Sequence, residues 1–286
     1  MKLCGDVLQL QMISKGGWQM TRKLGVIMVA ILLISMAFLT EPKSAGAEEA
    51  FCMPTAAPFY GTPPFTYKDN RILSVLFKTN PEVLRKLVPQ PLIPNADNFI
   101  FVYIGILNVG DPPTFTYKEM GIGIPVSLSG IPGNFCPYMY LDKAMPIAGG
   151  REIYGFPKKD SDFKFIEEKG RVVAKMMRAG STLLDVTLQL SKKVEPIPER
   201  PSAPWYNLKL IPSIKKNAPP DVKHITSNTV SDRVVKEEYT GNVELKFGSS
   251  PYDPLGQIEV TEIVYGSFLV SDFILGYGEV VHDYLR

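Results

Sequence analysis

The sequence predicts a β-rich α+β protein in which an antiparallel sheet closes into a barrel or cone around a pocket, with a few helices packed outside. Two observations predict this fold. Segments in which apolar and polar residues alternate recur along the chain, and turns rich in proline and glycine separate them. Strands with one buried face leave edges that must be covered, and closure of the sheet covers them most simply.

Alternation identifies the strands. Val172, Ala174 and Met176 share one face of a strand, and the even-numbered residues from Leu184 to Leu190 share a face of another. By the same pattern and by turn residues at their ends, further strands are expected over residues 72–77, 99–107, 124–128, 205–211, 225–230, 243–247, 258–265 and 279–285.

Two helices are expected outside the sheet. The first covers residues 81–88, because Asn80 can cap its free amides, Pro81 suits the first turn, and Pro89 ends the run. The second covers residues 267–275, with Gly276 as its C-terminal stop.

The N-terminal region is typical of a secretory signal peptide. Arg22 and Lys23 precede an uncharged run over residues 24–39, and small residues at Ala45 and Ala47 predict cleavage after Ala47. An uncleaved anchor is the alternative, although the run is shorter than the roughly 20 residues that span a bilayer. We expect a leader over residues 1–47, of which 1–19 are untranslated if Met20 is the true start, and one domain over residues 48–286.

This leader predicts a periplasmic or secreted protein without stable membrane association after cleavage. The exported chain would keep Cys52 and Cys136, and the sequence leaves open whether they form a disulfide or remain two thiols. A net charge of +2 from 31 basic and 29 acidic residues gives no electrostatic footprint for nucleic acid, so a small molecule is the expected partner. Two histidines exclude a multi-histidine metal site, and we expect no metal and no cofactor.

The most informative segment covers residues 150–159, where Lys158 and Lys159 end a stretch rich in glycine, aromatic residues and proline. Only a neutral amine attacks a carbonyl carbon, and removal of water from around a lysine favours that neutral form. A solvated turn is the ordinary interpretation of two adjacent lysines.

Further runs accompany these lysines along the chain. They are Tyr140-Leu141-Asp142, Pro146-Ile147-Ala148-Gly149-Gly150-Arg151-Glu152, Phe156-Pro157-Lys158-Lys159, Tyr67-Lys68-Asp69-Asn70-Arg71, Tyr117-Lys118-Glu119-Met120-Gly121, Ile124-Pro125-Val126-Ser127, Pro251-Tyr252-Asp253-Pro254-Leu255 and the closing residues 278–285. Together they resemble the acetoacetate decarboxylase family, whose signature segment matches the sequence around the lysines, and the resemblance covers roughly residues 55–286.

The resemblance implies a barrel-like antiparallel sheet, assembly into homo-oligomers, and decarboxylation of acetoacetate or a related small β-keto acid through an imine on Lys158. It also places Arg71 and Glu119 in the pocket, where Arg71 would position the substrate carboxylate and Glu119 would transfer protons. We expect Arg151 and Glu152 to form a buried ion pair that holds the lysine loop.

The role of Lys159 follows from local geometry. If residues 157–159 are extended, the two lysine side chains point to opposite faces and their ammonium groups lie about 10 Å apart. At an effective dielectric of 20 that separation corresponds to about 1.7 kcal/mol, which is less than full burial can contribute. Desolvation should therefore prepare Lys158, and Lys159 is either a weak electrostatic tuner or a structural residue.

One departure from the family pattern leaves the reaction open. The family carries a second acidic residue on the strand before Glu119, whereas residues 99–109 contain no carboxylate and Val102, Tyr103 or Ile104 stands in its place. The alternatives are a Schiff-base aldolase or dehydratase acting on a larger keto acid, and a non-enzymatic periplasmic barrel that binds ligands. The run Gly121-Ile122-Gly123-Ile124-Pro125 lacks the helix start of a phosphate loop and is expected to be a turn.

Overall fold

The computed structural model describes residues 51–195 and 202–286. The chain divides into two units, Met1–Pro58 and Phe59–Arg286, and the second carries every strand and helix found in the described ranges. The predicted leader and its cleavage site after Ala47 lie outside the described residues. Within these ranges, no helix has both the length and the apolar character needed to cross a membrane.

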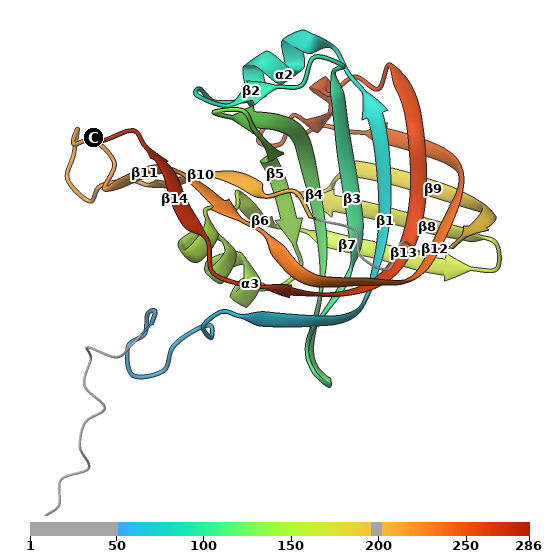
Figure 1. Cartoon of the computed structure of the whole chain (residues 1–286), viewed down its shortest axis with the longest axis horizontal. Coiled ribbons are helices and arrows are strands. Elements are labelled where there is room, and N and C mark those ends of the chain that lie inside the picture. Colours follow the sequence, from blue (N-terminus) through green and yellow to red (C-terminus); the bar gives the residue numbers. More distant parts are fainter. Residues whose placement is uncertain (1–50, 196–201) are drawn as a thin grey trace, which may run out of the picture. The chain divides into compact units, whose positions relative to one another are not determined.

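The second unit is built on one sheet of fourteen strands (Figure 1). The strands are β1 (Phe65–Lys78), β2 (Ile93–Pro94), β3 (Phe99–Gly110), β4 (Pro113–Leu128), β5 (Ile131–Leu141), β6 (Lys158–Asp160), β7 (Asp162–Glu168), β8 (Arg171–Arg178), β9 (Ser181–Val194), β10 (Trp205–Ile211), β11 (Val222–Asn228), β12 (Val230–Phe247), β13 (Glu262–Leu275) and β14 (Glu279–Asp283). Their order is β14-β11-β10-β5-β4-β3-β1-β13-β12-β9-β8-β7, while β2 pairs with β4 and β6 with β5. All pairs are antiparallel except β5 with β10 and β5 with β6.

The predicted β-rich fold is confirmed, but closure of the sheet is not. β14 and β7 stand at the two ends of the strand order, and no pairing joins them in the described part of the chain. Figure 1 shows that the sheet is strongly curved, but within the described residues its two end strands are not paired with each other. The edge strand β7 carries charged residues at Asp162, Lys164, Glu167 and Glu168, which protect an open edge against pairing with other chains.

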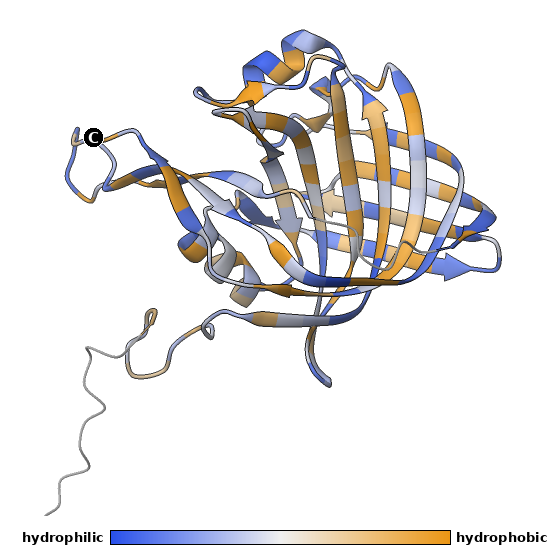
Figure 2. Cartoon of the chain, viewed as in Figure 1, coloured by the Kyte–Doolittle hydropathy of each residue, from blue (hydrophilic) through white to orange (hydrophobic). Residues whose placement is uncertain are grey.

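The concave face of this curved sheet holds the main hydrophobic core. Leu73, Val75 and Phe77 of β1 are buried there in one cluster with the alternating residues of β8 and β9. This confirms the alternation predicted for residues 172–176 and 184–190, which Figure 2 shows as bands of apolar and polar residues along the strands. Burial of these faces against each other supplies the main drive for folding.

One of the two predicted helices is present. The helix α2 (Pro81–Leu87) begins after Asn80, whose side chain accepts a hydrogen bond from the backbone N–H of Glu82, and it ends before Pro89. The helix predicted over residues 267–275 is wrong, because this segment belongs to β13. β13 pairs with β1 and β12, and residues 266–272 are buried without a break, so no alternation marks the strand.

Several strand predictions were too short. β4 runs for sixteen residues, of which the prediction contained only the last five, and its partner β5 was not predicted. The run from Gly121 to Pro125 lies inside β4 and is not the expected turn. After β5 the chain forms α3 (Ala144–Gly149) and the π-helical turn η2 (Gly150–Tyr154), which ends at Gly155 with φ of 78°, a left-handed conformation that favours glycine.

Candidate active site

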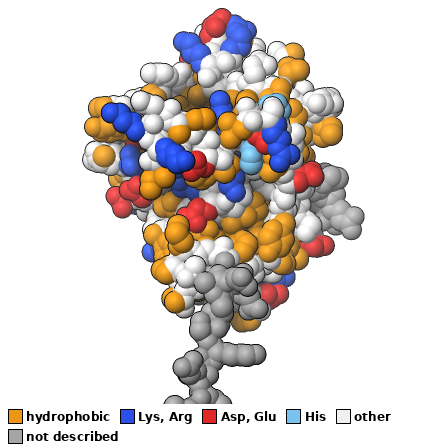
Figure 3. Space-filling model, turned by 90° about the vertical axis from the view of Figure 1, so that its left-hand side faces the viewer, with side chains coloured by type: hydrophobic (Ala, Val, Ile, Leu, Met, Phe, Trp, Pro, Cys, Tyr) orange, Lys and Arg blue, Asp and Glu red, His pale blue; other side chains and the backbone are white. Residues whose placement is uncertain are grey.

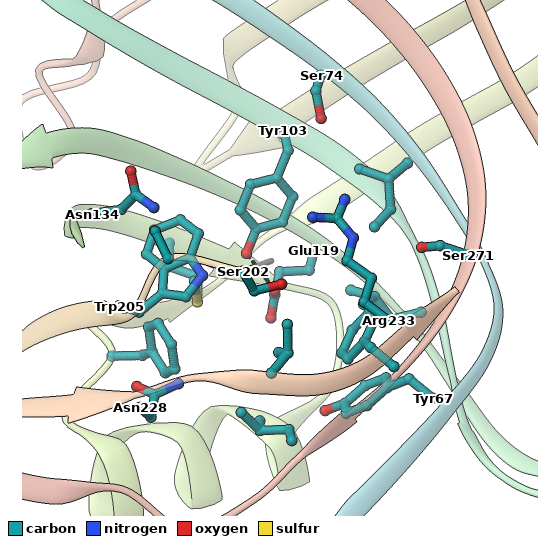
Figure 4. Close-up of a pocket in the computed structure, with 18 of the residues that line it drawn as sticks. Tyr67, Ser74, Tyr103, Glu119, Asn134, Ser202, Trp205, Asn228, Arg233 and Ser271 are labelled. Carbon is teal, nitrogen blue, oxygen red and sulfur yellow. Dashed lines mark hydrogen bonds between the residues drawn. The ribbon is translucent and has the colours of Figure 1, made fainter. Parts of the chain in front are cut away.

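The four strands β1, β3, β4 and β13 lie between the hydrophobic core and a cavity. Residues of one parity enter the core, and residues of the other line a cavity of about 280 Å³ on the opposite side. On β3, for example, Val102 and Ile104 are in the core, whereas Phe101 and Tyr103 line the cavity. Figure 4 shows side chains from distant strands converging on this cavity, among them Tyr103, Glu119 and Arg233.

A buried ion pair lies in the wall of the cavity. Lys158, the first residue of β6, donates a hydrogen bond from Nζ to Oε2 of Glu119 on β4 at 3.0 Å, and each side chain is only 8% exposed. The hydroxyl of Tyr103 donates to the other oxygen, Oε1, at 2.6 Å. The carboxylate is therefore fixed between a phenol and an amine, and Oε2 lies where it can exchange a proton with Nζ.

The lysine side chain is held by apolar contacts along its length. Its Nζ lies 5.8 Å from the ring centroid of Tyr117 and 5.6 Å from that of Phe156. Gly150 packs against the stem so closely that an added Cβ would lie 2.5 Å from Cδ and Cε of Lys158. A side chain at position 150 would therefore displace the amine from Glu119.

Of Val102, Tyr103 and Ile104, the three candidates from the sequence, only Tyr103 lines the cavity, whereas the other two lie in the core. The ring of Tyr103 crosses β4 above Gly121, where an added Cβ would come within 2.5 Å of a ring carbon, so the glycine lets the hydroxyl reach Glu119. Burial, reinforced by the negative charge of Glu119, raises the pKa of Tyr103 well above its ordinary value. The phenol thus stays protonated and acts as a hydrogen-bond donor near neutral pH.

The prediction that Arg71 lines the pocket is wrong. Its guanidinium donates to Oε1 of Glu167 at 2.5 Å and lies 5.4 Å from the ring centroid of Phe268, outside the cavity lining. The cause is an irregularity in β1 between Tyr67 and Asn70. Because of it, Tyr67 and Ile72 both line the cavity despite their opposite parity, and Arg71 points to the other face.

Arg233 of β12 is the arginine that lines the cavity, and sequence reasoning missed it (Figure 4). It follows Asp232, whose φ is 50°, in a stretch where the register of β12 against β13 shifts. A strand irregularity of this kind leaves no alternation to follow, and no motif surrounds the residue. Asn228 at the end of β11 also lines the cavity, and its side-chain Nδ2 is buried without a hydrogen-bond partner.

Lys159, Arg151 and Glu152 do not line the cavity, and each contacts another part of the protein. Lys159 points away from Lys158 and donates to Oδ1 of Asp253 at 2.7 Å, which favours the structural alternative for Lys159. Arg151 and Glu152 are exposed, so the expected buried pair is wrong: Arg151 donates to the backbone oxygen of Lys158 at 3.2 Å, and Glu152 accepts from the hydroxyl of Tyr60 at 2.5 Å.

Asp253 is the centre of a buried polar cluster. Its side chain has no exposed surface and accepts hydrogen bonds from Lys159, Arg178 and Tyr140. Burial alone would raise the pKa of this carboxyl, but these three hydrogen bonds outweigh it and lower the pKa to about 2. The cluster therefore fixes the outer face of β6 while Lys158 faces the cavity.

Cys136 is a buried free thiol and forms no disulfide. Its Sγ donates to the backbone oxygen of Tyr138 at 3.5 Å. Burial, with the nearby charge of Glu119, raises the pKa of this thiol, so it stays protonated.

Comparison with known proteins agrees with this geometry. The model of the acetoacetate decarboxylase family matches residues 52–285. An acetoacetate decarboxylase of Burkholderia multivorans is 33% identical over 241 residues, which cover 83% of this chain and 96% of that protein. One from Ralstonia nicotianae is 32% identical over 241 residues, covering 82% of this chain and 96% of that protein.

Solved structures give the same result. The acetoacetate decarboxylase of Legionella pneumophila superposes with a TM-score of 0.71 at 26% identity, over 87% of this chain and 100% of that chain. The enduracididine biosynthesis enzyme MppR shares the fold, with a TM-score of 0.73 at 19% identity over 86% of this chain and 99% of that chain. With the family model covering residues 52–285, this chain belongs to the acetoacetate decarboxylase family.

Proposed function

We propose that this protein is a carboxy-lyase that removes carbon dioxide from acetoacetate or a related small β-keto acid through an imine on Lys158. The buried pair of Lys158 and Glu119, in a cavity with aromatic walls, carries this proposal. Neutral Lys158 adds to the ketone and water leaves. The protonated imine then accepts the electron pair of the breaking carbon–carbon bond, carbon dioxide departs, and the resulting enamine is protonated on carbon and hydrolysed to a ketone.

The neighbouring residues transfer protons and position the substrate. Glu119 takes the proton that Lys158 must lose and returns it during loss of water, while Tyr103 holds the carboxylate in position. Arg233 orients the substrate carboxylate within the cavity. It serves positioning and not tight binding, since a strong ion pair with the carboxylate would oppose its departure as neutral carbon dioxide.

Trapping with borohydride tests the proposal. Incubation with acetoacetate and sodium borohydride should add the mass of a reduced imine to the peptide that contains Lys158, and untreated substrate should release carbon dioxide. The Lys158→Ala variant is the control for labelling at other lysines. A panel of β-keto acids that leaves Lys158 unmodified would refute the imine mechanism and would favour a ligand-binding protein.

Tyr103 supports a second candidate function. Tyr103 places a phenol beside Glu119 on β3, a strand without a carboxylate, and a protonated phenol does not repel a substrate carboxylate as an ionised acid would. An enzyme of this kind could use the same imine for aldol condensation or dehydration of a larger keto acid. In the trapping experiment, an adduct on Lys158 without release of carbon dioxide, and with formation of a carbon–carbon bond, would identify this reaction.

We also propose that the protein is exported after cleavage at Ala47 and assembles into homo-oligomers. The basic, apolar and small-residue segments of the leader support export. Large apolar side chains are exposed in the described part of the chain, among them Leu210 and Val280, and they support self-association. Figure 3 shows apolar side chains gathered on one face of the molecule. Intact mass of the protein from its native host should show Glu48 as the first residue, and light scattering should give a multiple of the subunit mass. A chain with an intact leader, or a monomer, would contradict the corresponding part.

A further inference from the structure

A second cavity, of about 120 Å³, lies on the other side of Lys158. Its lining is almost entirely apolar and includes Phe65, Val109, Phe115 and Met145, together with Gly150. It shares the lysine with the first cavity, and the two cavities also share Tyr67, Tyr117, Phe156 and Leu275 as a partition. The proposed nucleophile therefore stands at the junction of two separate spaces.

The amine itself reaches both spaces. Nζ of Lys158 is bonded to Glu119, which lines only the first cavity, and an added Cβ on Gly150, which lines only the second, would lie 2.9 Å from the same nitrogen. An imine carbon attached to Nζ is planar and carries two substituents that point apart. Each substituent of a bound ketone can therefore enter its own cavity.

The side chains that line each cavity indicate which substituent of the ketone it would bind. The first cavity offers hydrogen-bond donors, namely Arg233, the partnerless Nδ2 of Asn228 and the buried Oγ of Ser202, which suit a carboxylate arm. In the second cavity the tyrosine hydroxyls already have partners. Tyr60 binds Glu152, Tyr154 binds the backbone of Gly276, and Tyr67 pairs with Tyr117. The second cavity thus suits an alkyl group.

We propose that the second cavity is a specificity pocket, and that the substrate is a β-keto acid whose keto carbon carries an alkyl chain of about three or four carbons. This inference rests on the proposed imine chemistry of Lys158. An engineered cavity of about 150 Å³ in another protein holds a benzene molecule. The 120 Å³ space beside Lys158 is somewhat smaller, and the methyl group of acetoacetate would leave most of it empty.

A series of substrates tests the pocket. We expect kcat/KM to rise from acetoacetate through 3-oxopentanoate to 3-oxohexanoate by about fourfold for each buried methylene, and to fall for 3-oxodecanoate, whose chain exceeds the cavity. Each substrate loses carbon dioxide and yields the methyl ketone that is one carbon shorter. A flat or falling series, with Lys158 still trapped as an imine, would refute the pocket and leave the proposed function intact. Failure of every substrate to modify Lys158 would refute the function itself.

Substitutions in each cavity test whether the preference for chain length arises in the second one. Val109 lines only the second cavity, and Val109→Phe should lower the ratio of kcat/KM for 3-oxohexanoate to that for acetoacetate at least tenfold. Val230 lines only the first cavity, so the matched change Val230→Phe should leave this ratio within threefold. If Val109→Phe does not fold, Met145→Ala provides the opposite test, because the enlarged cavity should shift the preferred chain to greater length. An unchanged ratio in folded Val109→Phe, or an unchanged optimum in Met145→Ala, would overturn the assignment.

Discussion

Replacing Lys158 with alanine should reduce the turnover of a β-keto acid by about 10⁴-fold or more, the scale on which loss of a covalent nucleophile acts in other enzymes. The amine of Lys158 donates to Glu119, and no other lysine of the described residues lines the cavity. Steady-state release of carbon dioxide measures the effect, with circular dichroism to show that the fold is intact. A folded variant that keeps more than about one per cent of turnover would exclude imine catalysis by Lys158.

Lys159→Ala is the matched control for this experiment. Lys159 points to the other face of β6, and its charge is paired with Asp253, so its field at the cavity is weaker than that of an isolated ammonium group. We expect turnover to stay within about tenfold and the acid limb of the pH–rate profile to move upward by less than about one pH unit. A much larger upward shift in a folded variant would show that the charge of Lys159, and not desolvation, prepares the nucleophile.

The largest effect on stability should come from Asp253→Asn. The carboxylate is fully buried and accepts hydrogen bonds from Lys159 and Arg178, so its neutralisation leaves two cations without their anionic partner. Because the Lys159 and Arg178 side chains keep 38% and 24% of their surface exposed, water solvates the two cations, and the free energy of unfolding should fall by about 2 kcal/mol. Urea unfolding of the two proteins measures this difference. The exposed residue Asp97 provides the control, because Asp97→Asn should change the unfolding free energy by less than about 0.5 kcal/mol.

The pH dependence of stability also tests the stabilising role of the Asp253 carboxylate. The pKa of Asp253 is lowered from 3.8 in its ordinary state to about 2 in the folded protein. The folded state therefore binds this proton less readily than the unfolded state, and the stabilisation is complete above pH 3.8 and disappears as the pH falls through 2. Acid titration of stability should show this loss in the wild type, and Asp253→Asn should lack it. An identical acid profile in both proteins would contradict the role given to Asp253.

The sequence predicted the site residues that lie in matching runs and missed those whose position depends on strand geometry. Lys158 and Glu119 lie in contiguous motifs, and the structure brings them together at 3.0 Å although 39 positions separate them. Arg71 also lies in a matching run, yet a strand irregularity before it turns its side chain away. Tyr103 and Arg233 sit in no motif, and their positions depend on Gly121 and on a shift of register that alternation cannot reveal.

For the fold, too, the sequence predicted the elements that have a local pattern and missed those that depend on tertiary structure. Strands with one buried face, such as β8 and β9, were predicted because alternation marks them. β13 is buried on both faces over residues 266–272, so its sequence shows no alternation, and Gly276 after it resembles the stop of a helix. Closure of the sheet depends on how the end strands meet in space. The sequence supplied only the general need to protect edges, and the charged β7 meets that need without pairing.

The close packing around Lys158 has a consequence for the entropy of the reaction. A free lysine side chain samples many rotamers, and ordering it costs about 2 kcal/mol. Here Gly150, the two aromatic rings and Glu119 restrict the side chain before any substrate arrives. The ordering occurs when the protein folds, so the amine reaches the substrate carbonyl without a further loss of conformational freedom. A larger residue at position 150 would disturb the step by pushing the amine out of this preorganised position, even with every reacting group still present.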